Sequence, residues 1–121
     1  RLGMEVNIVC PPEWSLENET SITIEDAIKT SDVLMTLRIQ LERHEDKFNH
    51  HPEEYNSKYG LNSKNIKNKK PSAIIIHPGP VNWGVELEES IMKHPSSRIN
   101  EQVENGVKLR AVLLQRSLKC K

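Results

Sequence analysis

Short apolar runs alternate along the chain with polar segments that contain proline and glycine. Residues 33–37 and 73–77 each hold four apolar residues between turn-forming neighbours, which predicts two buried strands. The alternating run at 5–10 predicts a further strand. Strand, helix, strand, long connection, strand and helix is the order typical of a parallel α/β sheet.

Capping signals and helical spacing predict the helices. Ser21 or Thr23 can cap a short helix over 24–30, and acidic residues occupy its first turn. Weaker helical segments are expected within 38–59 and over 63–69. A long final helix is expected over 99–118, where apolar residues recur at Val103, Val107, Ala111, Leu114 and Leu118. The predicted fold class is α/β, with a three-layer parallel sheet covered by helices on both faces.

The first three residues are typical of a helix end. Arg1 would lie in a last helical turn, and Gly3 would follow at the position where helices often stop. A domain that begins in this way is expected to lack its first elements, so the sequence predicts a fragment of a longer protein.

Composition excludes several classes of function. The chain has 17 basic and 17 acidic residues, so it lacks the basic excess expected of a protein that neutralises nucleic-acid phosphates. Its longest aliphatic run, 73–76, is far shorter than the roughly 18 residues of a membrane span. No signal peptide is visible, which makes the cytoplasm the expected compartment. The spacing of Cys10 and Cys120 favours neither a disulfide framework nor a thiolate zinc site.

Candidate chemistry lies at the carboxyl ends of the two predicted strands, where parallel sheets bind ligands. Arg38 and Gln40 follow the first strand, and on an extended chain they point to the same side. An arginine can grip a carboxylate with two parallel hydrogen bonds, and an amide offers one donor and one acceptor. Glu42 and Arg43 are close enough in sequence to hold Arg38 in place. The alternative is an arginine in a salt bridge at the sheet rim.

The second strand runs into His77, Pro78, Gly79 and Pro80. Two prolines around a glycine form a stiff loop that cannot continue the sheet, so its carbonyl groups remain available to a ligand N–H. A cis bond before Pro80 is plausible in such a loop. The alternative is a turn that only terminates the strand.

Metal and cofactor sites are not favoured. Several potential ligands cluster in the polar connection, but their spacing matches no metal motif: His44, Glu45, Asp46, His50, His51, Glu53 and Glu54. The chain also lacks a glycine-rich phosphate loop and a nucleophile elbow. We therefore expect no metal, no cofactor and no catalytic side chain within these residues.

The two strand ends resemble those of aspartate carbamoyltransferases, particularly bacterial catalytic chains. The specific pair is arginine-x-glutamine at 38–40 and histidine-proline-x-proline at 77–80. Further matching segments keep the same order along nearly the whole chain: 31–44, 59–61, 76–86, 97–99, 104–107 and Arg110.

The resemblance implies transfer of the carbamoyl group of carbamoyl phosphate to L-aspartate, in pyrimidine synthesis, by a homotrimer. Residues 1–98 would form the aspartate-binding domain, and 99–121 a helix that returns to a carbamoyl-phosphate domain. Arg38 and Gln40 would bind aspartate, and the backbone of Gly79 and Pro80 would receive the carbamoyl group. Glu42, Arg43, His77 and Pro78 would support the site. The phosphate-binding segments of the family lie outside this chain, so the chain alone is expected to be inactive.

Two alternatives stay open. Ornithine carbamoyltransferases carry cysteine where this chain has Pro78 and lack the arginine-x-glutamine pair, so both positions favour aspartate. Related bacterial chains have arginine where this one has Trp83, which leaves room for a non-catalytic, carbamoyltransferase-like chain with only a binding role.

Overall fold

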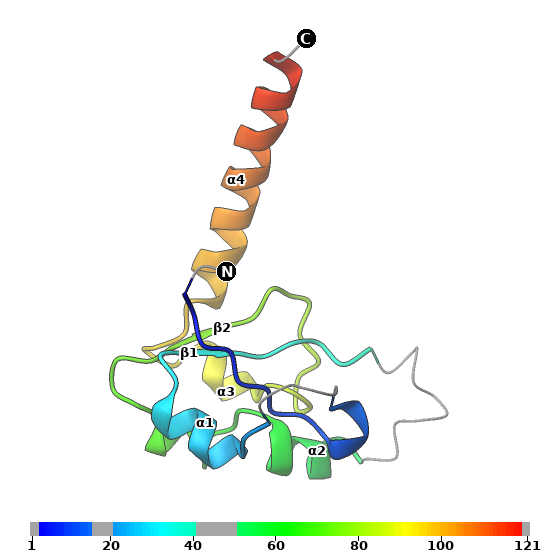
Figure 1. Ribbon diagram of the computed structural model, residues 1–121, viewed down its shortest axis with the longest axis vertical. Coiled ribbons are helices and arrows are strands. Elements are labelled where there is room, and N and C mark those ends of the chain that lie inside the picture. Colours follow the sequence, from blue (N-terminus) through cyan, green and yellow to red (C-terminus); the bar gives the residue numbers. More distant parts are fainter. Residues whose placement is uncertain (1–2, 16–20, 41–50, 120–121) are drawn as a thin grey trace.

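The computed structural model describes residues 3–15, 21–40 and 51–119 as a mixed α/β structure (Figure 1). Its elements, in chain order, are η1 (Pro12–Trp14), α1 (Ile24–Thr30), β1 (Val33–Met35), α2 (Pro52–Tyr59), η3 (Ile66–Asn68), β2 (Ile74–Ile76), α3 (Glu89–Met92) and α4 (Ile99–Lys119).

The described sheet consists of β1 and β2, which pair in parallel. Val33 aligns with Ile74 and Met35 with Ile76. This pairing confirms that the apolar runs at 33–37 and 73–77 are parallel neighbours. In Figure 1, α1, α2 and α3 lie below the sheet, and α4 rises from its other side.

The strand predicted over 5–10 is wrong. In that segment only Ile8 pairs, through an isolated parallel bridge to Ser21, in which the Ile22 N–H donates to the Ile8 carbonyl at 3.1 Å. Met4 and Val6 are largely exposed. Alternation of apolar and polar residues specifies which face a side chain takes, but it does not supply a neighbouring strand to pair with.

The helix predicted over 24–30 is confirmed as α1, with Thr23 as its cap. The Asp26 N–H donates to Thr23 Oγ1 at 3.1 Å, and the Thr23 hydroxyl donates back to the Asp26 carboxylate at 2.8 Å. Ile24, Ala27 and Ile28 lie on its buried face. Local signals sufficed here because cap and apolar face fall within one short segment.

The other helices depart from the sequence expectations in length and number. The helix at 52–59 lies within the predicted polar connection, whereas the weak helix at 63–69 shortens to η3. Asn62 explains this, because its side-chain oxygen accepts the N–H groups of Lys64 and Asn65 at 3.1 and 3.0 Å and forms a turn instead. Helix α3 was not expected.

Helix α4 confirms the predicted final helix and projects from the domain (Figure 1). Ile99, at its start, is its one buried residue among those described. The apolar residues further along α4 are exposed: Val103, Val107, Leu109, Val112, Leu113, Leu114 and Leu118. No helix in the described ranges is both long and apolar enough to span a membrane.

Two apolar clusters support the sheet. The larger one joins α1, the strands, η3 and the starts of α3 and α4 through nine buried residues: Ile24, Ile28, Leu34, Leu61, Ile66, Ile75, Leu87, Ile91 and Ile99. The smaller one contains Ile39, Tyr55 and Val85, with Trp14 and Tyr59 packed against it. The smaller cluster lies beneath the strand ends, because Ile39 belongs both to this cluster and to the segment that follows β1.

Candidate functional site

The two strand ends lie side by side, as the sequence predicts. Beyond β1, the Thr36 N–H donates to the Ile76 carbonyl at 3.2 Å. Further along, the Asn82 side-chain amide donates to the Ile39 carbonyl at 2.7 Å. The segments 36–40 and 77–82 are therefore joined at both ends, and the two groups of candidate residues share one edge of the sheet.

Burial of Ile39 orients its neighbours. The Ile39 side chain is 6% exposed and packs against Tyr55 and Val85. Because successive side chains of an extended chain alternate, Arg38 and Gln40 take the opposite face. Arg38 is half-buried and Gln40 is exposed. A guanidinium and an amide on one accessible face can together bind a small carboxylate.

The loop after β2 combines a buried base with an exposed tip. His77 is fully buried, whereas Pro78, Gly79 and Pro80 are exposed. The Gly79–Pro80 bond is cis, in agreement with the sequence expectation. Gly79 has φ of +72°, a conformation that side chains disfavour, and its N–H donates to His77 Nδ1 at 2.8 Å. The exposed tip presents its backbone next to the Arg38 segment.

Glu86 and Asn82 lie in the candidate site, although no sequence motif indicates a role for either. Glu86 is 3% exposed, and its Oε1 accepts the Asn82 N–H at 2.6 Å and lies 3.3 Å from His77 Nε2. Both residues fall within the matching segment 76–86, but nothing in their local pattern indicates that they contact His77 and Ile39.

Other residues named from the sequence fall elsewhere. Glu42 and Arg43 lie outside the described residues, as do the possible metal ligands His44, Glu45, Asp46 and His50. Within the described ranges, no three histidine, cysteine, aspartate or glutamate side chains are close enough to hold a metal ion.

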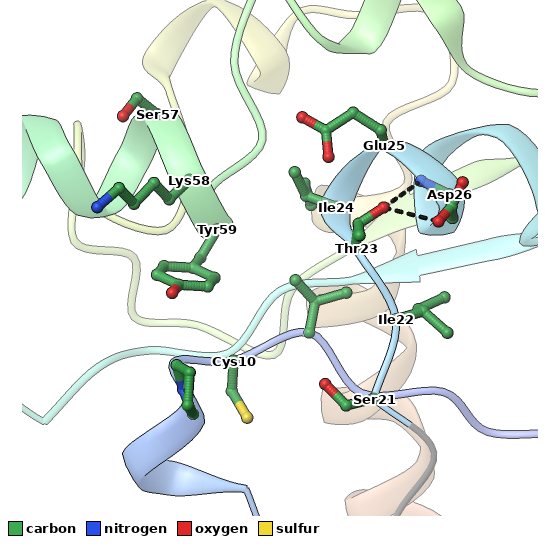
Figure 2. A pocket seen from close by; sticks show the side chains of 12 residues that line it. Cys10, Ser21, Ile22, Thr23, Ile24, Glu25, Asp26, Ser57, Lys58 and Tyr59 are labelled. Atoms are coloured by element: carbon green, nitrogen blue, oxygen red, sulfur yellow. Dashed lines mark hydrogen bonds between the residues drawn. The ribbon is translucent and has the colours of Figure 1, made fainter.

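A separate pocket of about 670 Å³ lies between α1, α2 and the segment around Cys10 (Figure 2). Thr23, which caps α1, and Asp26 in the first turn of α1 line one side of it, and Lys58 and Tyr59 from α2 line the other. Its lining includes neither strand-end segment. No motif in the sequence indicates this pocket, which arises where the helices meet.

Comparison with known proteins agrees with the motifs at the strand ends. The family model described as "Aspartate/ornithine carbamoyltransferase, Asp/Orn binding domain" matches residues 1–116. The chain belongs to this family. The resemblance drawn from the strand-end motifs is thereby confirmed.

Similar sequences include two bacterial aspartate carbamoyltransferase catalytic subunits. The chain is 40% identical to that of Streptococcus suis over 119 residues, which are 95% of this chain and 39% of the relative. It is 40% identical to that of Staphylococcus carnosus over 111 residues, which are 90% of this chain and 37% of the relative. This member of the carbamoyltransferase family therefore spans about two fifths of the length of these relatives.

Solved structures share the fold. Aspartate transcarbamoylase from Trypanosoma cruzi, in complex with carbamoyl aspartate and phosphate, aligns with a TM-score of 0.61 at 24% identity, covering 74% of this chain and 27% of that one. Ornithine carbamoyltransferase from Pyrococcus furiosus aligns with a TM-score of 0.55 at 23% identity, covering 67% of this chain and 26% of that one.

Proposed function

We propose that the chain is the aspartate-binding part of an aspartate carbamoyltransferase, which makes N-carbamoyl-L-aspartate and phosphate from L-aspartate and carbamoyl phosphate. The observation that carries this proposal is the junction of the two strand ends. The hydrogen bond from Asn82 to the Ile39 carbonyl, at 2.7 Å, holds the Arg38–Gln40 face beside the exposed Gly79–Pro80 backbone.

Each strand end supplies one half of the recognition. The Arg38 fork binds a carboxylate of aspartate, and the Gln40 amide supports it. The backbone carbonyls at Gly79 and Pro80 accept hydrogen bonds from the carbamoyl N–H₂ group. Holding the amine and the carbamoyl carbon in contact is the main contribution that these residues make to the rate. His77 and Pro78 shape the loop, and Glu42 and Arg43 support the bound arrangement.

The rest of the reaction depends on groups outside these residues. Charge that develops on the phosphate leaving group of carbamoyl phosphate is stabilised by a phosphate-binding domain. Residues 1–98 belong to the aspartate domain, whose three layers are a larger parallel sheet and the helices on its two faces. Residues 99–121 belong to the helical segment that packs on the other domain. The exposed apolar side chains of α4 support this division. We further propose a homotrimer that works in the cytoplasm without metal or cofactor.

Aspartate is preferred over ornithine because ornithine carbamoyltransferases lack the pair formed by Arg38 and Gln40 and have cysteine where this chain has Pro78. A binding role without catalysis is the second candidate. It is favoured by Trp83, which is half exposed on the loop beside the site, where related bacterial chains carry arginine.

A chimera tests the proposal. Residues 1–116 replace the matching segment of the Streptococcus suis catalytic subunit, and the carbamoylated product is measured: N-carbamoyl-L-aspartate with L-aspartate and citrulline with L-ornithine. Transfer to aspartate alone supports the proposed enzyme. A folded chimera that binds carbamoyl phosphate but transfers nothing contradicts it. If Trp83→Arg then restores transfer, the second candidate applies to the natural chain.

A further inference from the structure

One buried carboxylate contacts both parts of the loop that follows β2. Gly84, with φ of +77°, makes the turn that brings Glu86 back beneath this loop. The turn is held by the Gly84 N–H, which donates to the Leu87 carbonyl at 2.9 Å, and by the Leu61 N–H, which donates to the Glu86 carbonyl at 3.1 Å. The Glu86 side chain is thereby enclosed by its own loop.

The contacts of His77 determine which ring nitrogen carries the proton. Nδ1 accepts the Gly79 N–H at 2.8 Å, so it has no proton of its own. The imidazole is therefore neutral, with its proton on Nε2, 3.3 Å from Glu86 Oε1. This contact is not a hydrogen bond, and Nε2 has no hydrogen-bond partner among the described residues. The contact is a carboxylate facing an N–H rather than an ion pair.

The same carboxylate oxygen holds Asn82. Glu86 Oε1 accepts the Asn82 backbone N–H at 2.6 Å, while the Asn82 side chain reaches across to the Ile39 carbonyl. A continuous chain of contacts thus runs from Gly79 through His77, Glu86 and Asn82 to Ile39, which lies between the two residues that face the ligand.

Packing alone does not account for a glutamate at this position. A buried carboxylate is costly unless its oxygens are well paired, and an apolar side chain of the same size is often neutral or stabilising. Glu86 Oε2 has no hydrogen-bond partner among the described residues. The cost of burying the Glu86 carboxylate is explained if the contacts of its Oε1 hold the candidate site in place.

We propose that Glu86 is a positioning residue for carbamoyl transfer: it holds the Asn82 backbone and reinforces the His77 tautomer that the Gly79 N–H selects, and so aligns the Gly79–Pro80 backbone with the Arg38–Gln40 face. The expected effect of Glu86 on kinetics rests on the proposed function, but its effect on His77 and Asn82 does not.

Two substitutions of Glu86 separate alignment from packing. Glu86→Met keeps the volume and removes the acceptor, whereas Glu86→Gln keeps an oxygen that can accept from both His77 and Asn82. Glu88→Met is the matched control, because Glu88 also accepts a backbone N–H, from Ser63 at 2.6 Å, but away from this loop.

The first readout is the ring ¹⁵N spectrum of His77 in the 121-residue chain. The proton is expected on Nε2 in the natural chain, in Glu86→Gln and in Glu88→Met, and it is expected to shift towards Nδ1 in Glu86→Met, with a changed Gly79 amide signal. A natural chain with the proton on Nδ1, or an unchanged spectrum in Glu86→Met, overturns the proposal.

The second readout is steady-state kinetics in the chimera. Glu86→Met is expected to lower kcat by about tenfold to a hundredfold, as misplacement of reacting groups does, with KM for aspartate changed less than threefold. Glu86→Gln is expected to restore most of kcat. Equal losses in both Glu86 variants, with both folded, contradict the proposal. If the unsubstituted chimera transfers nothing, the proposed function fails, and the His77 spectra still decide the positioning role.

Discussion

Substitution of Asn82 by aspartate removes the donor of the hydrogen bond that joins the two strand ends. The Asn82 amide donates to the Ile39 carbonyl at 2.7 Å, and its own N–H is held by Glu86 Oε1 at 2.6 Å. In Asn82→Asp an ionised carboxylate has no proton to donate, so two oxygens face each other. The new charge also lies near the Glu86 carboxylate. The neutral truncation Asn82→Ala only removes the donor.

The expected magnitudes follow from these contacts. Loss of one hydrogen bond with a partly buried acceptor costs about 1 kcal/mol, the expectation for Asn82→Ala. The facing oxygens and the added charge bring Asn82→Asp to about 2–3 kcal/mol. Unfolding entropy near 2.1 cal/mol/K per residue gives about 4 °C per kcal/mol for a chain of this length. Asn82→Asp should therefore lower Tm by about 8–12 °C at neutral pH.

The dependence on pH identifies the cause. A protonated carboxyl can donate to the Ile39 carbonyl, so the folded state favours the protonated form, and the pKa of the new group is expected to lie above the ordinary value of about 3.9. A group whose pKa is higher in the folded state than in the unfolded state stabilises the folded protein at pH values below the unfolded-state pKa. This stabilisation is lost as pH rises through the folded-state pKa. Relative to Asn82→Ala, Asn82→Asp should recover stability as pH falls from 7 to about 4.

Thermal and urea unfolding, followed by circular dichroism across this pH range, checks the prediction. A Tm for Asn82→Asp within about 2 °C of the natural chain at pH 7 would contradict the prediction, since the Ile39 contact would then contribute nothing to stability. A deficit that does not change with pH would show that the facing oxygens are not its cause.

Three further predictions concern other parts of the molecule. Arg38→Lys replaces a planar fork by a point charge, so kcat/KM for aspartate in the chimera should fall about tenfold to several-hundredfold in a kinetic assay, while KM for carbamoyl phosphate stays nearly constant. Gly60→Ala should lower the free energy of unfolding by about 1–3 kcal/mol in urea titrations, because a Cβ there would lie 2.7 Å from both Asn56 Nδ2 and the Val85 carbonyl oxygen. Burial raises the pKa of Tyr55, and the charges of Cys10 and Glu86 raise it further. The free energy of unfolding, measured in urea, should therefore fall as pH rises above about 10, and it should fall less in Tyr55→Phe.

Much of the candidate site could be predicted from the sequence, because the two motifs follow recognisable strands. The alternation at 38–40 and the prolines around Gly79 predict which residues are accessible at each strand end, and parallel pairing of the strands brings the two ends to one edge of the sheet. The connections between them could not be predicted. Asn82 and Ile39 are 43 positions apart, and neither residue carries a local mark of its partner.

Local signals in the sequence were enough to predict α1 with its Thr23 cap, the long α4, and the parallel pair formed by 33–37 and 73–77. The prediction failed at 5–10, where alternation was present but no strand lay beside the segment. The placement of Glu86, the tautomer of His77 and the burial of Ile39 against Tyr55 follow instead from long-range packing. Each of these depends on which distant side chain fills the space beside it, and a one-dimensional pattern of apolar and polar residues does not encode that neighbour.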